Sequence, residues 1–228
     1  MIWAIVPAKT LGRAKTRLAS MLEPEERRAL SLEMLRDVLG TLLGARTIDR
    51  VAVVTQDNVV GCTAYALGAG VLLDGGRGHN AALEGAIAHC QSKGASGVLI
   101  VSADLPLLRS RTVEQMVAQA MEHPSSHLVL LAPSRDGTGT NALFQRPPGV
   151  LPLHFGPQSL QLHQHVAQER QTPVQLVRSV DLGLDIDTPA DLLDFARMAV
   201  PGHTQRILMQ MQLMERVLEH FYGTAPVL

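Results

Sequence analysis

VLIVSADLPLL, at residues 98–108, carries the clearest structural pattern of the chain. It begins with four consecutive apolar residues and continues into an aspartate, Asp104, which is followed two residues later by a proline. A short and continuous apolar run is typical of a strand that is covered on both faces, as the strands of parallel sheets are. We therefore expect a central buried strand over residues 98–102, with Asp104 placed just beyond its end.

A second acidic stretch, LGLDIDTP at residues 182–189, alternates apolar residues with Asp185 and Asp187. We interpret residues 182–187 as a strand, because successive side chains of a strand point to opposite faces and the two aspartates would then share one face. Two carboxylates that face the same way repel each other unless a cation lies between them. An ordinary helix start explains the threonine and proline that follow, but it leaves Asp185 unexplained. We predict that Asp104, Asp185 and Asp187 hold Mg²⁺ together with the phosphates of a substrate.

The composition bounds the class of protein. Of the 228 residues, 46% are hydrophobic and 18% are charged, which suits one large α/β domain with a well-buried core. The net charge of -1 and the 3% of aromatic residues argue against nucleic acid or an anionic membrane as partners. The N-terminus has no basic leader and no apolar run reaches the length of a membrane span, so we expect a cytoplasmic protein. Cys62 and Cys90 show no metal or redox spacing, and we interpret them as reduced structural thiols.

Apolar runs alternate with amphipathic segments along the whole chain. This alternation predicts a three-layer α/β/α sandwich around a mostly parallel, Rossmann-like sheet, with one domain over residues 1–228 and a C-terminal helical extension from about residue 202. The predicted strands cover residues 2–6, 51–55, 71–73, 98–102, 127–132, 142–144, 174–177 and 182–187. The predicted helices cover residues 24–43, 81–91, 111–122, 160–168, 190–200 and 205–221.

The loop after the first predicted strand, residues 7–18, is strongly basic. It holds Lys9, Arg13, Lys15 and Arg17 and no acidic residue. Ligands gather at the carboxyl ends of parallel strands, so we favour a phosphate-binding loop over a merely solvated surface. The loop lacks both the G-x-x-x-x-G-K-[ST] pattern of a P-loop and the G-x-G-x-x-G pattern of a dinucleotide fold.

Three further polar loops are candidates for ligand contact. Gly75 lies in a glycine-rich loop that lets backbone approach a ligand, and Asn80 at its end either caps the next helix or contacts a base edge. Thr140 lies in a loop of alternating glycines and hydroxyls, which offers donors to an anion. Ser159 lies near the start of a predicted helix, where it either binds an anion or serves as a cap.

Three histidines, His154, His163 and His165, lie close to Ser159 in the sequence. Their spacing does not match a zinc site with a fourth ligand. We interpret them as surface or packing residues.

Six motifs occur along residues 1 to about 200, and together they are specific, although DLP alone is common among nucleotidyltransferases. They are VPAKTLGRAKTRL (6–18), MLRDVL (34–39), SADLPLL (102–108), DGTGTNAL (136–143), FGPQS (155–159) and LGLDIDTPADL (182–192). In this set and order the chain resembles the guanylyltransferases of coenzyme F420 biosynthesis, the CofC/FbiD type, within the MobA-like nucleotidyltransferases.

The resemblance implies a nucleotide-diphospho-sugar transferase-like fold and a defined reaction. In this reaction a phosphorylated three-carbon acid attacks the α-phosphate of GTP, pyrophosphate leaves, and a GDP-linked acid forms. The acceptors known in the family are 2-phospho-L-lactate, phosphoenolpyruvate and 3-phosphoglycerate, and the sequence does not select among them. The family also implies that the unstable product passes to the next enzyme of the F420 pathway. The oligomeric state stays open, with a homodimer as one candidate.

The resemblance further implies roles for individual residues. The catalytic and metal-binding residues are Asp104, Asp185 and Asp187, with Lys15 as a further catalytic residue. The acceptor site consists of Thr140, Gly156 and Ser159, and the nucleotide site of Lys9, Lys15, Arg17, Gly75 and Asn80. The chain departs from the family at His79, where an apolar residue is expected, and this departure affects the contacts to the base.

Two alternatives compete with this interpretation. One is a MobA-like or sugar-phosphate nucleotidyltransferase, but those relatives begin with a glycine-rich L-x-G-G-type loop where this chain has Pro7-Ala8-Lys9. The other is a non-catalytic module that binds a phosphorylated metabolite, which would not need three metal-directed carboxylates. The choice of guanine over adenine rests on the resemblance.

Overall fold

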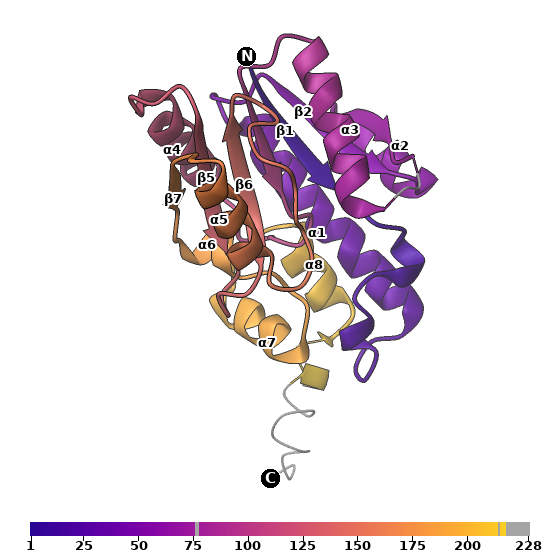
Figure 1. Ribbon diagram of the computed structural model, residues 1–228. Helices are drawn as coiled ribbons and strands as arrows, with labels where there is room; N and C mark the ends of the chain where they lie inside the picture. Colours follow the sequence, from indigo (N-terminus) through magenta and orange to yellow (C-terminus); the bar gives the residue numbers. More distant parts are fainter. Residues whose placement is uncertain (76–77, 214, 218–228) are drawn as a thin grey trace, which may run out of the picture.

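Strands and helices alternate along the chain in the computed structural model (Figure 1), which describes residues 1–75, 78–213 and 215–217, without the side chain of Arg13. The strands are β1 (Ile2–Pro7), β2 (Arg50–Thr55), β3 (Gly70–Leu73), β4 (Gly97–Val101), β5 (Leu128–Pro133), β6 (Thr140–Arg146) and β7 (Val174–Leu176). The α-helices are α1 (Pro24–Gly44), α2 (Asn58–Ala66), α3 (His79–Ser92), α4 (Ser110–Glu122), α5 (Ser159–Glu169), α6 (Val180–Gly183), α7 (Pro189–Met198) and α8 (His203–Gln210). Two short 3-10 helices follow β1, namely η1 (Leu11–Arg13) and η2 (Thr16–Leu18).

The strands form a sheet in the order β3-β2-β1-β4-β6-β5-β7. β1 pairs in parallel with both β2 and β4, and the pairs β2–β3 and β5–β7 are also parallel. β6 is antiparallel to both of its neighbours, β4 and β5. Because β6 runs the opposite way, it starts at the edge of the sheet where β4 ends. Its first residues, Thr140 and Asn141, are therefore delivered to the carboxyl ends of the parallel strands.

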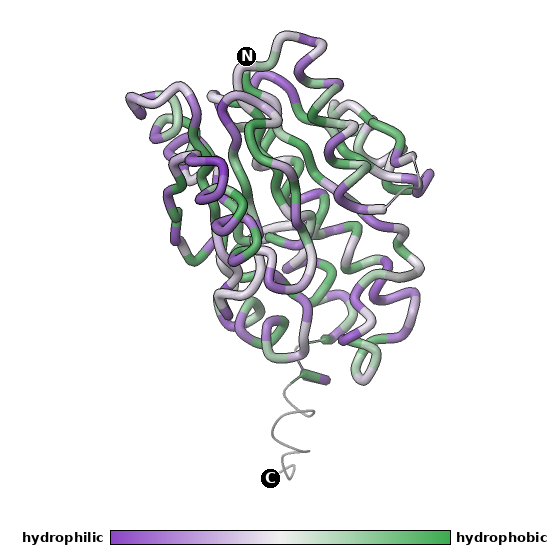
Figure 2. The backbone as a smooth tube through the Cα atoms, viewed as in Figure 1, coloured by the Kyte–Doolittle hydropathy of each residue, from purple (hydrophilic) through white to green (hydrophobic). Residues whose placement is uncertain are grey.

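Alternate residues of the central strands build two separate cores. Leu99 of β4 packs into a core shared with α1, α2 and α4, whereas Val98 and Ile100 pack into a core shared with α3 and α5. Figure 1 shows the sheet between these two sets of helices, and Figure 2 shows the apolar strands in the interior. This arrangement confirms the predicted α/β/α sandwich with a mostly parallel sheet.

A third apolar cluster joins α7 and α8 to the start of α1 and to the segment after α6. Asp37 of α1 fixes the start of α8, because its carboxylate accepts the backbone N–H groups of His203 and Thr204 at 2.7 and 2.8 Å. Free N–H groups at a helix start need such acceptors. The C-terminal part of the described chain is thereby held against α1, across 166 residues of sequence.

The strand predicted over residues 182–187 is wrong. The single-turn helix α6 ends at Gly183, and residues 184–187 are extended chain that joins no strand of the described sheet. The expected alternation of faces still holds, since Leu184 and Ile186 are buried while Asp185 and Asp187 are partly exposed. Ile186 donates its N–H to the carbonyl of Asp104 at 3.2 Å, so this segment is pinned to the loop after β4 instead of to a strand.

Two other elements differ from the sequence analysis. The helix α2 is not predicted, because its capping residue Asp57 looks like an ordinary turn residue. The helix predicted over residues 205–221 is interrupted, since α8 ends at Gln210, Gln212 adopts a left-handed backbone with φ of 51°, and residues 213 and 215–217 are helical again. Residues 218–221 of that prediction lie outside the described part. The other predicted strands and helices are confirmed, with shifted ends. No helix within the described ranges is long and apolar enough to cross a membrane.

Gly97, at the start of β4, is packed against large side chains of two neighbouring strands. A Cβ added to it would lie 2.6 Å from Cζ of Phe144 and 3.0 Å from Cδ1 of Ile2. We expect Gly97→Ala to lower the free energy of unfolding by about 1–3 kcal/mol, as overpacking of a core does. Urea denaturation measures this loss. The matched control is Gly40→Ala on the exposed face of α1, where nothing lies near the added Cβ and stability should rise by about 0.4–1 kcal/mol. Equal stability of the two variants would contradict the packing argument.

Candidate active site

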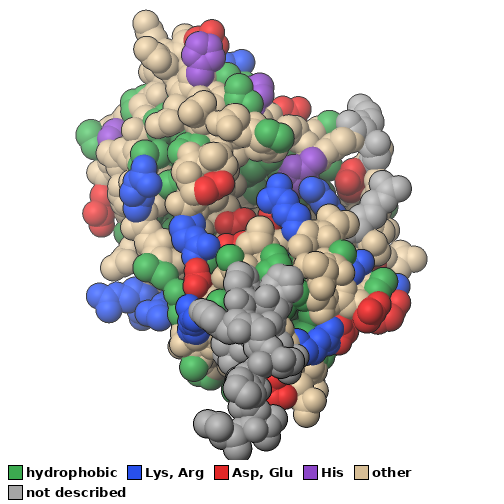
Figure 3. All heavy atoms as spheres, turned by 90° about the horizontal axis from the view of Figure 1, so that it is seen from below, with side chains coloured by type: hydrophobic (Ala, Val, Ile, Leu, Met, Phe, Trp, Pro, Cys, Tyr) green, Lys and Arg blue, Asp and Glu red, His purple; other side chains and the backbone are tan. Residues whose placement is uncertain are grey.

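The candidate active site is a cavity of about 440 Å³ at the carboxyl ends of β1 and β4. Its lining includes the loop after β1, the loop after β4, the start of β6 and the segment after α6, together with residues of α1, α2, α3 and the loop before α5. Figure 3 shows this hollow from below, with acidic side chains inside it and Lys and Arg side chains around it. Opposite charges therefore meet in one concave place.

Three carboxylates lie together in this cavity, as the sequence predicts. Oxygen atoms of Asp104, Asp185 and Asp187 lie within 4.8 Å of one another. Oδ1 of Asp104 is buried, and no group in the described part of the chain forms a hydrogen bond with it. A buried carboxylate oxygen that lacks a partner is costly. The three residues thus offer a set of hard oxygen ligands, and Oδ1 of Asp104 is among those that the protein leaves open.

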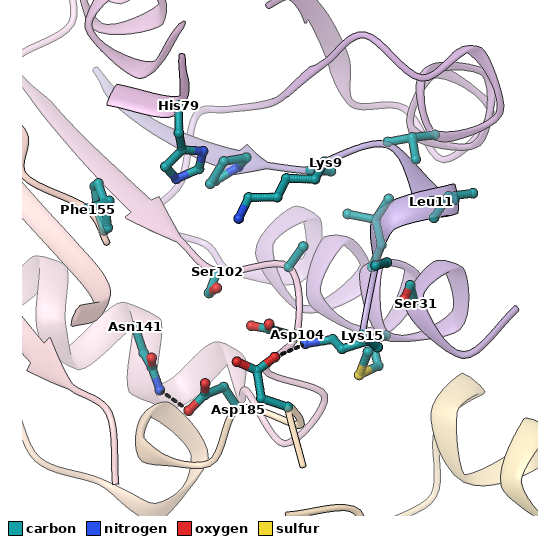
Figure 4. Close-up of a pocket in the computed structure, with 18 of the residues that line it drawn as sticks. Lys9, Leu11, Lys15, Ser31, His79, Ser102, Asp104, Asn141, Phe155 and Asp185 are labelled. Carbon is teal, nitrogen blue, oxygen red and sulfur yellow. Dashed lines mark hydrogen bonds and ion pairs between the residues drawn. The ribbon is translucent and has the colours of Figure 1, made fainter. Parts of the chain in front are cut away.

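The segments that carry Asp104 and Asp185 are joined through Asn141, although they are distant in the sequence. The N–H of Ser102 bonds to the carbonyl of Asn141 at 2.9 Å, which ties the end of β4 to the start of β6. The side chain of Asn141 then donates to Oδ1 of Asp185 at 3.0 Å and to the carbonyl of Leu182 at 3.0 Å (Figure 4). Asn141 therefore aims Asp185 at Asp104.

Lys15 is the counter-charge of this cluster. It adopts a left-handed backbone with φ of 52° between η1 and η2, and its side chain is only 7% exposed. Its ammonium lies 2.5 Å from Oδ2 of Asp104 and 2.7 Å from Oδ1 of Asp187. Figure 4 shows the Lys15 ammonium directed at the carboxylates. The lysine of the basic loop is thus paired with two of the three acidic residues.

The charges of this cluster perturb one another. Burial alone would raise the pKa of Asp104, but the charge and the hydrogen bond of Lys15 outweigh it and hold this pKa below its usual range. Burial likewise opposes the charged form of Lys15, yet Asp104 and Asp187 together raise its pKa. Burial, followed by the charge of Asp104, raises the pKa of Asp185. Lys15 therefore neutralises part of the cluster, and Asp185 retains an uncompensated repulsion.

The rest of the basic loop borders the same cavity. Lys9 and Arg17 line it and are exposed, and Figure 4 shows the Lys9 side chain directed into it. The N–H of Leu11 donates to Oδ2 of Asp57 at 2.9 Å, while Oδ1 of Asp57 caps α2. Asp57 thus anchors the loop that carries the predicted nucleotide contacts Lys9, Lys15 and Arg17.

Only one of the three residues predicted for the acceptor lines the cavity itself. Thr140 is on its wall. Gly156 is exposed in the loop before α5, next to Phe155, which does line the cavity. Ser159 is the first residue of α5 and is 2% exposed. The capping alternative for Ser159 is wrong, because Gln158 is the N-cap residue.

The two residues predicted to contact the nucleoside are also separated from this cavity. Gly75 lines a second hollow of about 270 Å³ between β3 and α3. Asn80 lies within α3 and does not cap it, since Gly78 is the N-cap residue. Both ends of its amide contact the backbone of Phe155, with the N–H of Phe155 donating at 2.8 Å and the carbonyl accepting at 3.1 Å. Asn80 therefore ties α3 to the loop before α5, and its contact with a base stays a prediction.

The sequence analysis misses three residues that shape the cavity, namely Asn141, Ser102 and His79. Asn141 follows Thr140 within the motif DGTGTNAL, and this position points to a role in the site. Its contact with Asp185 depends on tertiary structure and cannot be seen in the sequence. His79 was noted only as a departure from the family. Its ring meets that of Phe155 edge-on at 5.9 Å, and burial followed by the charge of Lys9 lowers its pKa.

Comparisons with known proteins agree with this geometry. Residues 2–216 match a family described as "Guanylyl transferase CofC like". The chain is 39% identical to a phosphoenolpyruvate guanylyltransferase of Rubrobacter xylanophilus, over 90% of this chain and 96% of the relative. It is 37% identical to a 2-phospho-L-lactate guanylyltransferase of Methanothermobacter thermautotrophicus (92% and 90% covered) and 34% identical to a 3-phospho-D-glycerate guanylyltransferase of Colwellia psychrerythraea (86% and 92% covered).

Solved structures show the same architecture at low sequence identity. A putative nucleotide-diphospho-sugar transferase from Desulfovibrio desulfuricans superposes with a TM-score of 0.78 at 16% identity, over 95% of this chain and 97% of that one. This likeness confirms the predicted fold class. The family match spans nearly the whole described chain, and relatives above 30% identity cover it at similar length. The chain therefore belongs to the CofC-like guanylyltransferase family.

Proposed function

We propose that this protein transfers GMP from GTP to a phosphorylated three-carbon acid and releases pyrophosphate. The observation that carries the proposal is the meeting of three carboxylates with a basic loop in one cavity at the carboxyl ends of the strands. The names of the relatives supply the class of acceptor: phosphoenolpyruvate, 2-phospho-L-lactate or 3-phospho-D-glycerate. Within this chain, no residue type separates these three acids.

The residues present fit a magnesium ion. Asp104, Asp185 and Asp187 would hold it, because they supply carboxylate oxygens that lie close together. Oδ1 of Asp104 lacks a partner, and burial together with the charge of Asp104 raises the pKa of Asp185, so both carboxylates favour an added cation. When bound, Mg²⁺ neutralises phosphate charge and orients the phosphates of both substrates.

The proposed reaction makes one bond and breaks one. A phosphate oxygen of the acid attacks the α-phosphorus of GTP, a new phosphorus–oxygen bond forms, and the bond to the β-phosphate breaks with pyrophosphate as the leaving group. A phosphate monoester is already mostly ionised near neutral pH, with a second pKa of about 6. The nucleophile therefore needs no strong base, and the site supplies positioning and charge neutralisation instead.

The basic loop suits the triphosphate. Lys9 and Arg17 are exposed on the wall of the cavity and are available to phosphate oxygens. Lys15 is held by carboxylates that a magnesium ion would also bind, so with the metal and GTP present its ammonium would be available to the leaving phosphates. A cation in that place stabilises the charge that develops on pyrophosphate.

The acceptor is proposed to bind beside Thr140 and against the loop that holds Gly156. Thr140 lies on the cavity wall, and Phe155 brings the loop to the same cavity. Ser159 begins α5, and its hydroxyl suits a carboxylate or a phosphate, whereas the N–H groups of Ser159 and Leu160 already donate to the carbonyls of Gly156 and Thr138. Gly75 and Asn80 stay proposed contacts of the nucleoside.

The biological setting is proposed from the same family. The GDP-linked acid would serve coenzyme F420 biosynthesis in the cytoplasm, where the unstable product passes to the next enzyme of the pathway. A homodimer is the candidate assembly, which light scattering of the purified protein measures directly.

Incubation of the protein with Mg²⁺, GTP and each acid in turn tests the proposal. We expect pyrophosphate release to require the metal, GTP and one of the three acids together. Coupling to the next enzyme and its deazaflavin substrate traps the unstable product. Pyrophosphate release that does not depend on any of these acids would overturn the assignment, and release with ATP in place of GTP would overturn the choice of base.

Replacing a carboxylate ligand should abolish turnover. We expect Asp104→Asn and Asp187→Asn each to lose several kcal/mol of transition-state stabilisation, which is about a thousandfold or more in kcat/KM. Steady-state kinetics with a Mg²⁺ titration measure the loss, and Mn²⁺ binding provides a readout that is independent of turnover. The matched control is Glu122→Gln, an exposed acid at the end of α4. Near-normal activity in either aspartate variant would show that the metal assignment is wrong.

Lys15 should matter for GTP more than for the acid. We expect Lys15→Ala to raise the KM for GTP and to lower kcat, with a combined loss of about ten- to hundredfold for one charge-assisted contact. Lys93→Ala, at an exposed lysine after α3, should leave both constants unchanged. Unaltered GTP kinetics in the Lys15 variant would leave this residue with only its ion pairs to Asp104 and Asp187.

A further inference from the structure

His163 connects the parts of the proposed acceptor site. It lies on α5, one helical turn after Ser159, and it is completely buried. Its Nε2 accepts the backbone N–H of His154 at 2.9 Å, and its Nδ1 lies 3.1 Å from Oγ1 of Thr140. One imidazole therefore contacts both the strand that carries Thr140 and the loop that leads to Gly156.

These contacts fix the protons of the ring. A backbone N–H can only donate, so Nε2 of His163 must carry a lone pair. Burial, followed by the charge of His154, lowers the pKa of His163 to about 4, so the ring is neutral near pH 7. A neutral imidazole has one N–H group, and with Nε2 unprotonated that group is on Nδ1.

The protonated Nδ1 decides how Thr140 is used. Because Nδ1 donates, the hydroxyl oxygen of Thr140 accepts, and the hydrogen of that hydroxyl is left to donate elsewhere. Thr140 lines the cavity, beside the carboxylates and the basic loop. The opposite tautomer would turn the Thr140 hydrogen toward His163 and present a lone pair to the ligand, which repels an anion.

We propose that His163 is a positioning residue of the acceptor site, which makes Thr140 a hydrogen-bond donor to an anionic oxygen of the acid and holds the backbone before Gly156 in place. The proposal rests on the proposed function, since it assumes that the acid binds at Thr140. It adds a reason for selectivity: this wall of the cavity favours a carboxylate or phosphate oxygen over a group that can only donate.

The ring protonation is tested without any turnover. Long-range proton–nitrogen NMR spectra of protein labelled with ¹⁵N-histidine distinguish a protonated from an unprotonated ring nitrogen. The signals of His163 are those that disappear in His163→Gln. We expect Nδ1 to be protonated and Nε2 to be unprotonated at pH 7. A proton on Nε2, or on both nitrogens, would overturn the proposal.

Two substitutions separate the contacts of His163. A glutamine oxygen can replace Nε2 and keep the bond from His154, but it removes the donor to Thr140. An asparagine amide can replace Nδ1–H and keep that donor. We expect His163→Gln to raise the KM of the acid about tenfold or more, as loss of one hydrogen bond to a charged group does, with the KM of GTP unchanged. His163→Asn should raise the acid KM less.

A control and a double-mutant cycle complete the kinetic test. His165→Gln, on the exposed side of the same helix, should leave the acid KM unchanged. In a Thr140→Val background, His163→Gln should add little further loss, because its effect passes through Thr140. Additive losses in this cycle, or equal rises in the KM of acid and GTP, would reduce His163 to a packing residue.

The outcomes also distinguish this proposal from the proposed function. A wild-type protein that transfers GMP to none of the three acids overturns the proposed function and the acid-binding role with it. An active wild-type protein whose His163→Gln variant keeps a normal acid KM overturns the positioning role alone. If His163→Gln does not fold, as a thermal melt would show, the loss of signals in His163→Asn assigns His163, and the tautomer measured on labelled wild-type protein decides.

Discussion

Repulsion between three carboxylates is the constraint around which the site is arranged. Asp104, Asp185 and Asp187 bring their oxygens within 4.8 Å in a partly buried place, where water screens charge poorly. Only one ammonium, that of Lys15, lies among them in the described structure. The repulsion between these carboxylates is locally unfavourable. Clusters of this kind are usually found at functional sites, where a ligand compensates the charge. Three features of the site relate to this repulsion. They are the basic loop, the open oxygen of Asp104 and the contact of Asn141 with Asp185.

The sequence predicts the fold well where local pattern and tertiary role agree. The short apolar run at residues 98–101 predicts a buried central strand, and the structure has one there. The position of Asp104 just beyond the end of that strand follows from the sequence. At residues 184–187 the pattern identifies the exposed and buried sides correctly but the element wrongly, because any extended chain alternates its side chains, whether or not it pairs with a strand. Asp57 illustrates a related limit, since a helix cap and a turn residue look alike until the N–H groups they satisfy are known.

The site is less predictable than the fold, because its residues are selected by contacts between distant segments. The carboxylates and Lys15 can be predicted, because charged residues just beyond the ends of parallel strands lie where ligands bind. Asn80 and Asn141 both follow glycine-containing loops in the sequence. In the structure Asn80 bonds to the backbone of Phe155, whereas Asn141 donates to the carboxylate of Asp185. His163 was interpreted as a surface or packing residue, and its two hydrogen bonds link segments that no spacing rule connects.

The antiparallel strand β6 has a geometric consequence for the two sides of the cavity. Neighbouring residues of a strand point to opposite sides, so Thr140 turns toward His163 while Asn141 turns toward Asp185. These two contacts are thus separated by a single residue step of one strand, roughly 3.4 Å along its axis. Strand β6 therefore fixes the spacing between Thr140 and the carboxylate cluster. A slip of one residue in its pairing with β4 would exchange the two side chains and break both contacts at once.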